Sequence, residues 1–256
     1  MDKLTPAMNN PPFHHVPASH GFLWIRHAWR MYWLNPLMWI AYSVTIVIVG
    51  ASLSMIPVVG SFAFQLLSPA FNGGLMMAAR DQHRQQPLHI KYLLAAFHSH
   101  GAQLVTIGGV YMTGMILAFT LPSLFSDDPF IHALMYEPIK TLPTVIMHSH
   151  LSLTASLVLL ASLTLFTAML MAYWFAPALV SLADYPAIKA MKVSFAACTA
   201  NFAAFIVYGV LMFTLLIIGS VPFLLGYLIV IPLGFISYYS AYEDLFTPVT
   251  HREPTP

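Results

Sequence analysis

Long apolar stretches separated by short polar ones make up most of this chain. The first, Leu37 to Ile56, contains no charged residue. It is long enough to cross the hydrocarbon core of a bilayer, which needs about 20 predominantly apolar residues in a helix. Five later stretches resemble it, and none contains Asp, Glu, Lys or Arg. The pattern predicts six transmembrane helices, at about residues 37–56, 62–79, 102–121, 151–180, 202–219 and 223–242.

A short segment of mixed character precedes every second span. In Phe22–Leu34, helical spacing places Arg26 and Arg30 on one side, while Trp29 and Trp33 lie largely on the other. A basic face opposite an aromatic one is typical of a helix that lies in the headgroup layer. Two further segments take the corresponding places before later spans: Ile90–Phe97 and Ala187–Ala200. We therefore predict an all-α integral membrane protein with three helical hairpins, each preceded by a short interfacial amphipathic helix.

Weak internal repetition supports the hairpin prediction. Pro69 and Asp81 recur as Pro232 and Asp244, and each pair is separated by the same distance (232 − 69 = 244 − 81 = 163). Repetition at a fixed offset is the sequence signature of repeated supersecondary units.

The remaining segments are tails and one long loop. Residues 1–18 are rich in Pro and Asn and have no apolar period, so we expect a mobile tail before a membrane domain at 19–246. Residues 247–256 form a second tail, and 122–150 form the long loop. No cleavable signal peptide is evident near the first apolar stretch.

Composition and charge narrow the class of protein. The chain is 59% hydrophobic and 7% charged, whereas soluble domains carry about 25% charged residues. A net charge of +1 argues against nucleic acid as a partner. Cys198 is the only cysteine, which excludes an intrachain disulfide and a CxxC site. In the six-span arrangement, one side holds every Lys and Arg except Lys140, so we expect both termini in the cytoplasm.

Two neighbouring motifs carry a resemblance to a known family. FAPALV at 175–180, followed by AMKVSFAAC at 190–198, resembles the signature of an uncharacterised family of bacterial six-span integral membrane proteins. More distantly, the order of proline, acid and helix entry is similar to the membrane domain of some glycerophosphodiester phosphodiesterases. The resemblance implies a six-helix fold in the bacterial cytoplasmic (inner) membrane. It implies no catalytic residue, and the phosphodiesterase barrel is absent from this chain.

Signatures of catalysis are missing from the sequence. No G-x-S-x-G, H-E-x-x-H or P-loop motif occurs. Asp127 and Asp128 are adjacent carboxylates in the long loop, and we interpret them as solvated charges rather than a catalytic pair. We therefore expect a protein that is not an enzyme and has no cofactor.

Polar residues within the predicted spans are few. Ion-coupled transporters usually place an ionisable group within the membrane, and its absence here argues against that class. Asn72 is the most polar side chain deep in a span. We favour an interhelical hydrogen bond for Asn72, with a substrate contact as the alternative.

The histidine pairs offer the most metal-like spacing. On a helix, His98 and His100 would point about 200° apart. His148 and His150 lie on the opposite side of the membrane in the predicted topology, so the two pairs cannot share one site. We favour structural roles, and a metal site at His148 and His150 remains the alternative. The fifteen methionines are interpreted as core packing.

Three acids just past the cytoplasmic ends of spans need a physical explanation: Asp81, Asp184 and Asp244. Negative charge is disfavoured at a helix C-terminus. We expect them to pair with nearby Arg or Lys, or to serve the start of the following helix. A docking site for a protein partner is the alternative.

These observations favour a non-enzymatic structural or accessory role in contact with lipid or with a membrane-protein partner. Anionic lipid headgroups are the expected partners of four basic residues on the short helices: Arg26, Arg30, Lys189 and Lys192. A transporter or channel for a small or lipid-like substrate is the alternative function.

Overall fold

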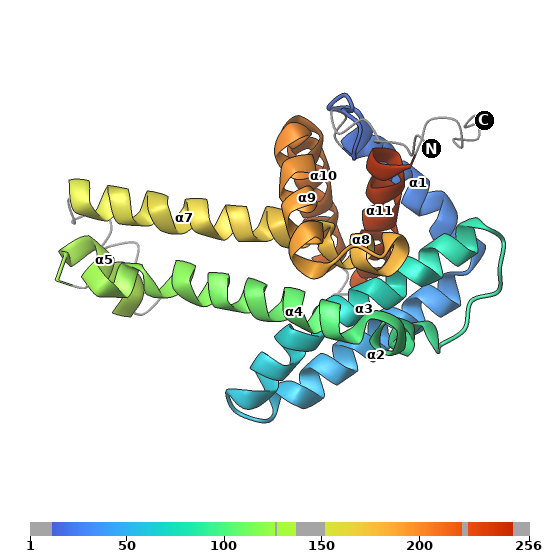
Figure 1. Cartoon of the computed structure of the whole chain (residues 1–256), viewed down its shortest axis with the longest axis horizontal. Coiled ribbons are helices and arrows are strands. Elements are labelled where there is room, and N and C mark those ends of the chain that lie inside the picture. The colour runs from blue at the N-terminus through green and yellow to red at the C-terminus, as the bar shows by residue number, and fades with distance from the viewer. Residues whose placement is uncertain (1–11, 126, 137–151, 222–224, 248–256) are drawn as a thin grey trace, which may run out of the picture.

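The computed structural model describes residues 12–125, 127–136, 152–221 and 225–247. All regular elements in these ranges are helical, which confirms the all-α prediction. They are α1 (His20–Leu34), α2 (Pro36–Ser54), α3 (Val59–His83), α4 (Tyr92–Thr120), the 3-10 helix η1 (Pro122–Phe125), α5 (Pro129–Tyr136), α7 (Leu153–Trp174), α8 (Ala176–Ala183), α9 (Ala187–Ala200), α10 (Phe202–Ser220) and α11 (Tyr227–Phe246) (Figure 1).

Each predicted short segment forms a helix that ends at one residue outside the helical region. Asn35, with φ −153°, separates α1 from α2, because the residue before a proline avoids the helical conformation. His100, with φ −135°, kinks α4 after its first turns. Asn201, with φ −116°, separates α9 from α10. The short helices are therefore joined directly to the long helices that follow them.

Helix contacts link the first, middle and last parts of the described chain to one another in turn, and the last part also packs against the first. The long helices pack in pairs, α2 with α3, α4 with α7 and α10 with α11. In addition, α3 packs against α4, α7 against α9, and α11 against α1. The last contact brings the final helix of the described chain onto the first.

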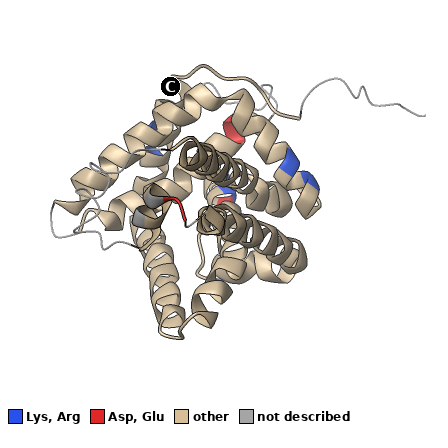
Figure 2. Ribbon diagram, turned by 90° about the vertical axis from the view of Figure 1, so that its left-hand side faces the viewer, with Lys and Arg blue, Asp and Glu red and all other residues tan. Residues whose placement is uncertain are grey.

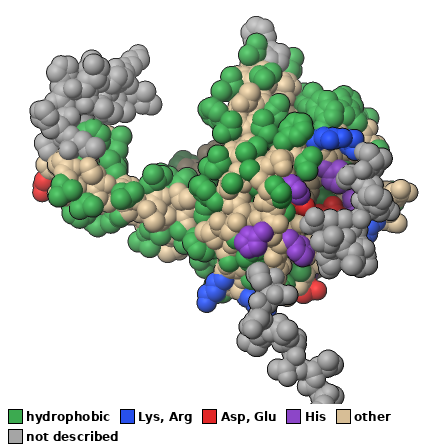
Figure 3. Space-filling view, turned by 90° about the horizontal axis from the view of Figure 1, so that it is seen from above, with side chains coloured by type: hydrophobic (Ala, Val, Ile, Leu, Met, Phe, Trp, Pro, Cys, Tyr) green, Lys and Arg blue, Asp and Glu red, His purple; other side chains and the backbone are tan. Residues whose placement is uncertain are grey.

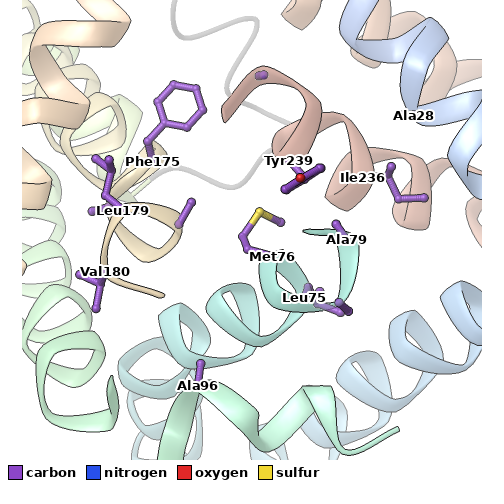
Figure 4. Packing of buried hydrophobic residues seen from close by; sticks show 14 of the residues in the cluster. Ala28, Leu75, Met76, Ala79, Ala96, Phe175, Leu179, Val180, Ile236 and Tyr239 are labelled. Carbon is purple, nitrogen blue, oxygen red and sulfur yellow. The ribbon is translucent and has the colours of Figure 1, made fainter. Parts of the chain in front are cut away.

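The core lies where α3, α8 and α11 meet. Leu75, Met76, Leu179, Ile236 and Tyr239 are buried there. Figure 4 shows Met76 between the side chains of Leu179 and Tyr239, which come from the two neighbouring helices. Small residues allow this close packing, as expected for helices in a membrane.

Two glycines show how closely the backbones approach. A Cβ atom on Gly74 would lie 2.1 Å from the carbonyl oxygen of Tyr92, where α3 meets the start of α4. A Cβ atom on Gly21 would lie 2.3 Å from the carbonyl oxygen of Ala204, where α1 meets α10. Both positions exclude any side chain unless the helices move apart.

Four helical stretches are long and apolar enough to cross a membrane: Pro36–Ser54, Tyr92–Phe125, Leu153–Ala183 and Phe202–Ser220. The predicted spans 62–79 and 223–242 lie within α3 and α11, which are not among the four. Both helices carry charged residues near their C-terminal ends, and both bury a larger share of their residues in the protein than the four candidates do. The structure therefore confirms membrane-capable helices and leaves the count of six unconfirmed.

The long helices do not share one direction. Figure 1 shows α4 and α7 side by side, running away from the rest of the molecule, with α5 at their far end. The helices α10 and α11 run in a clearly different direction in the same view.

Part of the predicted N-terminal tail is held against the body. The backbone NH of His14 donates to the carbonyl oxygen of Leu245 at 2.8 Å. The NH of Val16 donates to Asn201 Oδ1 at 2.8 Å. His14 and Val16 therefore contact the end of α11 and the joint before α10. The remainder of the predicted tail, 1–11, lies outside the described residues.

The predicted long loop contains regular structure where it is described. The helices η1 and α5 lie within 122–150, and the side chain of Ile131 is buried against Ala155 and Val158 of α7. Asp128 is more than the solvated charge we expected. Its carboxylate accepts hydrogen bonds from the backbone NH groups of Phe130 and Ile131 and so caps the start of α5.

Candidate functional site

A polar contact joins α3 and α7 in the apolar part of the protein. The side-chain amide of Asn72 donates to the hydroxyl of Tyr173 at 2.9 Å. Ser68 Oγ lies 3.3 Å from the same hydroxyl, and the ring of Tyr111 lies 4.5 Å from the Tyr173 ring. The structure therefore gives Asn72 a protein partner on a neighbouring helix.

At the break between α7 and α8, a side chain from α9 forms hydrogen bonds with the backbone. Pro177 stands near the start of α8, and the α7–α8 break leaves backbone groups without helical partners. The NH of Phe175 donates to Ser194 Oγ at 2.8 Å, and the Ser194 hydroxyl donates to the carbonyl oxygen of Met171 at 2.6 Å. The FAPALV motif, which contains Phe175, is thus hydrogen-bonded to the AMKVSFAAC motif, which contains Ser194.

A second polar group lies at one end of the helices, where α1, α3 and α11 meet. We name it the α1–α3–α11 cluster and define it as His20, Trp24, His27, His83, Glu243 and Asp244. His20 Nδ1 lies 2.7 Å from Asp244 Oδ2, and the indole NH of Trp24 donates to the same oxygen at 2.9 Å. This carboxylate therefore holds the first two turns of α1 against the last turn of α11.

The other half of the cluster places two imidazoles beside one carboxylate. His83 Nε2 lies 3.3 Å from Glu243 Oε1, and the rings of His83 and His27 are 6.2 Å apart, edge to face. Burial lowers the pKa of His27, and the nearby Glu243 carboxylate opposes this effect. The second half of α1 is therefore held against α3 and α11 with His27 favoured in its neutral form.

A third contact between a histidine and a carboxylate lies at the kink of α4. His100 Nε2 is 2.7 Å from Asp184 Oδ1, and Asp184 adopts the left-handed conformation, with φ 55°, after α8. Gln103 Oε1 accepts a hydrogen bond from the NH of Ala187 at 2.7 Å and so serves the start of α9. The side chain that accepts a hydrogen bond at the start of α9 is therefore Gln103, not Asp184 as we expected.

The expected partners of the three acids are therefore only partly correct. Asp81 pairs with Arg80 at 3.0 Å and also accepts a hydrogen bond from the hydroxyl of Tyr92, at the start of α4. Asp184 and Asp244 instead contact His100 and His20. Histidine takes the place that we assigned to Lys or Arg at these two positions.

The four basic residues on α1 and α9 are all exposed, and they form two pairs on separate helices. On α1 the buried side chains include Trp24, Ile25 and Ala28. The outer face carries large apolar and basic side chains together: Phe22, Arg26, Trp29, Arg30 and Trp33. Our expectation that the tryptophans and the basic residues occupy opposite faces of α1 is wrong, because residues three, four and seven positions apart share one face of a helix, and Arg26, Trp29, Arg30 and Trp33 have this spacing.

The other two short helices have outer faces of the same kind. On α9 the exposed residues include Ile188, Lys189, Lys192 and Phe195. Around the start of α4 they include Ile90, Lys91, Leu94 and His98. Each short helix therefore buries small or apolar residues against the body and presents a mixed basic and apolar face outward.

One known protein is similar to most of the chain. It is a protein of Burkholderia thailandensis that is named as a probable inner membrane protein. The two are 29% identical over 204 residues, which cover 78% of this chain and 74% of the relative. No family model and no solved structure matches the chain. The similarity supports an uncharacterised family of membrane proteins, and the resemblance to phosphodiesterase membrane domains stays a prediction.

Charged residues are distributed in a way that suits such a protein. Figure 2 shows that most of the ribbon carries no charged position. Figure 3 shows histidine side chains beside acidic and basic ones on one face of the molecule. The part formed by α4 and α7, which runs away from the rest of the molecule, is covered mainly by hydrophobic and uncharged side chains.

No metal centre is evident in the described part of the chain. Within the residues described, no group of three or more His, Cys, Asp or Glu side chains is placed to hold a metal ion. His98 contacts the carbonyl oxygen of Leu94 in its own helix, whereas His100 contacts Asp184. His148 and His150, our alternative metal ligands, lie outside the described residues.

Sequence reasoning did not identify the cluster residues His20, Trp24 and His83. The signal that was available is spacing. His20 and His27 are seven positions apart, two helical turns, and so lie on one face of α1.

Proposed function

We propose that this chain is a multi-pass protein of the bacterial inner membrane with both termini in the cytoplasm. Its long helices form three hairpins with six crossings, and its three short helices lie along the cytoplasmic surface. Its role is non-enzymatic: it is a structural or accessory protein that contacts anionic lipid headgroups or a membrane-protein partner.

The observation that carries this proposal is the outer face shared by the three short helices. Aromatic and aliphatic side chains suit the boundary of the acyl region, and interspersed Lys and Arg suit the phosphates above it. The similarity to a probable inner membrane protein supports the same placement.

The size of the lipid contact can be estimated. One basic side chain near an anionic leaflet contributes about 1 kcal/mol. Arg26, Arg30, Lys189 and Lys192 together contribute about 4 kcal/mol before screening by salt. The apolar helices already anchor the protein, so this energy would serve to orient it and to select lipid.

Lipid analysis tests the proposal. A variant with Arg26, Arg30, Lys189 and Lys192 all replaced by Gln should insert normally and co-purify with less anionic lipid. The matched control keeps the charges by exchanging Arg for Lys and Lys for Arg at the same four positions, and it should retain the lipid. An unchanged lipid complement in the Gln variant would show that these charges face water or protein instead.

A transporter or channel is the second candidate, and one observation favours it. Discontinuous helices line substrate sites in many transporters, and the α7–α8 break lies close in sequence to Tyr173, the partner of Asn72. The test uses Asn72→Cys in a Cys198→Ala background. Reaction with a membrane-impermeant thiol reagent would indicate a hydrated path and favour transport, whereas no reaction would favour a closed packing contact.

A further inference from the structure

Three contacts between segments far apart in the chain pair a histidine with a carboxylate. The pairs are His20–Asp244, His83–Glu243 and His100–Asp184. The remaining pair, Arg80–Asp81, lies within α3. The whole chain contains 12 His against 10 Lys and Arg. Histidine is therefore the common partner of the acids in these three contacts.

Helix α1 carries two histidines, His20 and His27, in contrasting surroundings. His20 contacts the carboxylate of Asp244, and the indole NH of Trp24 donates to the same oxygen, so two side chains attach the first turns of α1. His27 instead faces the imidazole of His83, which already has Glu243 as its partner. A proton on His27 therefore finds a like charge and a carboxylate that is shared.

The charged and titratable groups around His27 come from each element at this end. Helix α11 contributes Glu243 and Asp244, α3 contributes His83, and α1 itself contributes Arg30. Beyond His83 lies the ring of Tyr239, at 6.3 Å. Arg80 and Arg84, near the end of α3, act on Tyr239, and Arg80 is paired with Asp81.

We propose that α1 is a proton-sensitive clamp. On acidification its first turn stays fastened to Asp244, while its second half, from His27 onward, loosens from α3 and α11. The cause is the protonation of His27, whose ring lies 6.2 Å from that of His83, beside a Glu243 carboxylate that His83 already contacts.

The direction of the pH effect follows from the surroundings of His27. Burial lowers its pKa in the folded protein. The stability that neutral His27 supports is therefore present above the ordinary histidine pKa of about 6.5 and is lost as the pH falls below that value. The clamp itself does not depend on the proposed lipid contact. The use of the clamp to alter how α1 lies on a membrane does rest on that proposal.

Hydrogen exchange on the full chain in detergent tests the clamp. Backbone protection is measured at about pH 7.5 and about pH 5.5, after correction for intrinsic exchange. Residues 27–34 should lose up to about tenfold of their protection at the lower pH, because about pH 5.5 lies about one unit below the ordinary histidine pKa, which limits the change to about tenfold. Residues 20–24 should keep theirs. His27→Asn should remove the difference between the two halves of α1.

His98→Asn is the matched control, because His98 is exposed and contacts only a carbonyl oxygen of its own helix. It should retain the wild-type pH dependence. If His27→Asn does not fold, His83→Asn serves instead, because that side chain is 40% exposed and its loss removes the ring that His27 faces. Equal protection of 27–34 at both pH values, or an unchanged pH dependence in His83→Asn, would overturn the proposal.

Discussion

Helices α7 and α11 both come from stretches that the sequence predicted to cross the membrane, yet they occupy opposite environments. On α7 a row of leucines is exposed, with Leu160 at 61%. On α11 the side chain of Ile236 is fully buried, and the helix ends in the α1–α3–α11 cluster. The difference teaches that apolar composition identifies helices suited to face lipid more readily than helices suited to face protein. Helix α11 can carry Ser237, Glu243 and Asp244 because neighbouring helices supply their partners.

The largest expected effect contrasts one residue from each environment. Ile236→Ala should lower the free energy of unfolding in detergent by about 2–5 kcal/mol, because the cavity left in a packed core is not refilled. Leu160→Ala should change it by less than about 0.5 kcal/mol, since detergent replaces the lost contact. Thermal or denaturant unfolding of the two variants measures both. Equal losses would mean that α7 is also packed against protein.

A glycine pair sharpens the comparison. Gly74→Ala places a Cβ atom 2.1 Å from a backbone oxygen of Tyr92, and we expect a loss of about 1–3 kcal/mol from overpacking. Gly209→Ala on α10 is the control, because no neighbouring atom lies within 4 Å of the new Cβ. It should be neutral or stabilising by about 0.5–1 kcal/mol, as alanine favours the helix. A destabilised Gly209→Ala variant would contradict the open surroundings assigned to α10.

The α7–α8 break gives the next effect. Ser194→Ala should cost about 1–3 kcal/mol, because it removes the side-chain partner of the Phe175 NH and of the Met171 carbonyl. Thr164→Ala is its control, since that hydroxyl bonds only to the carbonyl of Leu160 in the same helix. Both are read from unfolding curves under one set of conditions. A harmless Ser194→Ala substitution would mean that water closes the break.

The smallest effect concerns Asn72. Asn72→Ala should lower stability by about 0.6 kcal/mol, the average for interhelical hydrogen bonds in a membrane protein. Thr113→Ala, which loses only a bond to Gly109 in its own helix, is the reference. A much larger loss would indicate that Asn72 supports more than the Tyr173 contact.

Local features of the sequence predicted the helices well. The bounds of α9 agree with the predicted segment because Pro186 and Asn201 both interrupt helical conformation. The joint at Asn35 follows from Pro36 by a steric rule that needs no tertiary information. The ends of these helices depend on residues that are adjacent in the sequence, so the sequence alone predicts them.

Tertiary contacts explain what the sequence did not reveal. Helical spacing divides α1 into faces, but only packing decides that Trp24 rather than Trp29 is buried. The His20–Asp244 contact joins residues 224 positions apart, so no local sequence pattern predicts it. The same holds for His100 and Asp184, which meet because α4 is kinked at His100 itself.

The central claim is that the α4–α7 pair crosses the bilayer, so that its far end lies on the opposite side from α9. Two exposed positions test it in a Cys198→Ala background: Asp127→Cys at the far end and Lys189→Cys on α9. A membrane-impermeant maleimide added to intact cells should label Asp127→Cys and leave Lys189→Cys unlabelled until the membrane is opened. Labelling of both positions, or of neither, from the outside would contradict the claim.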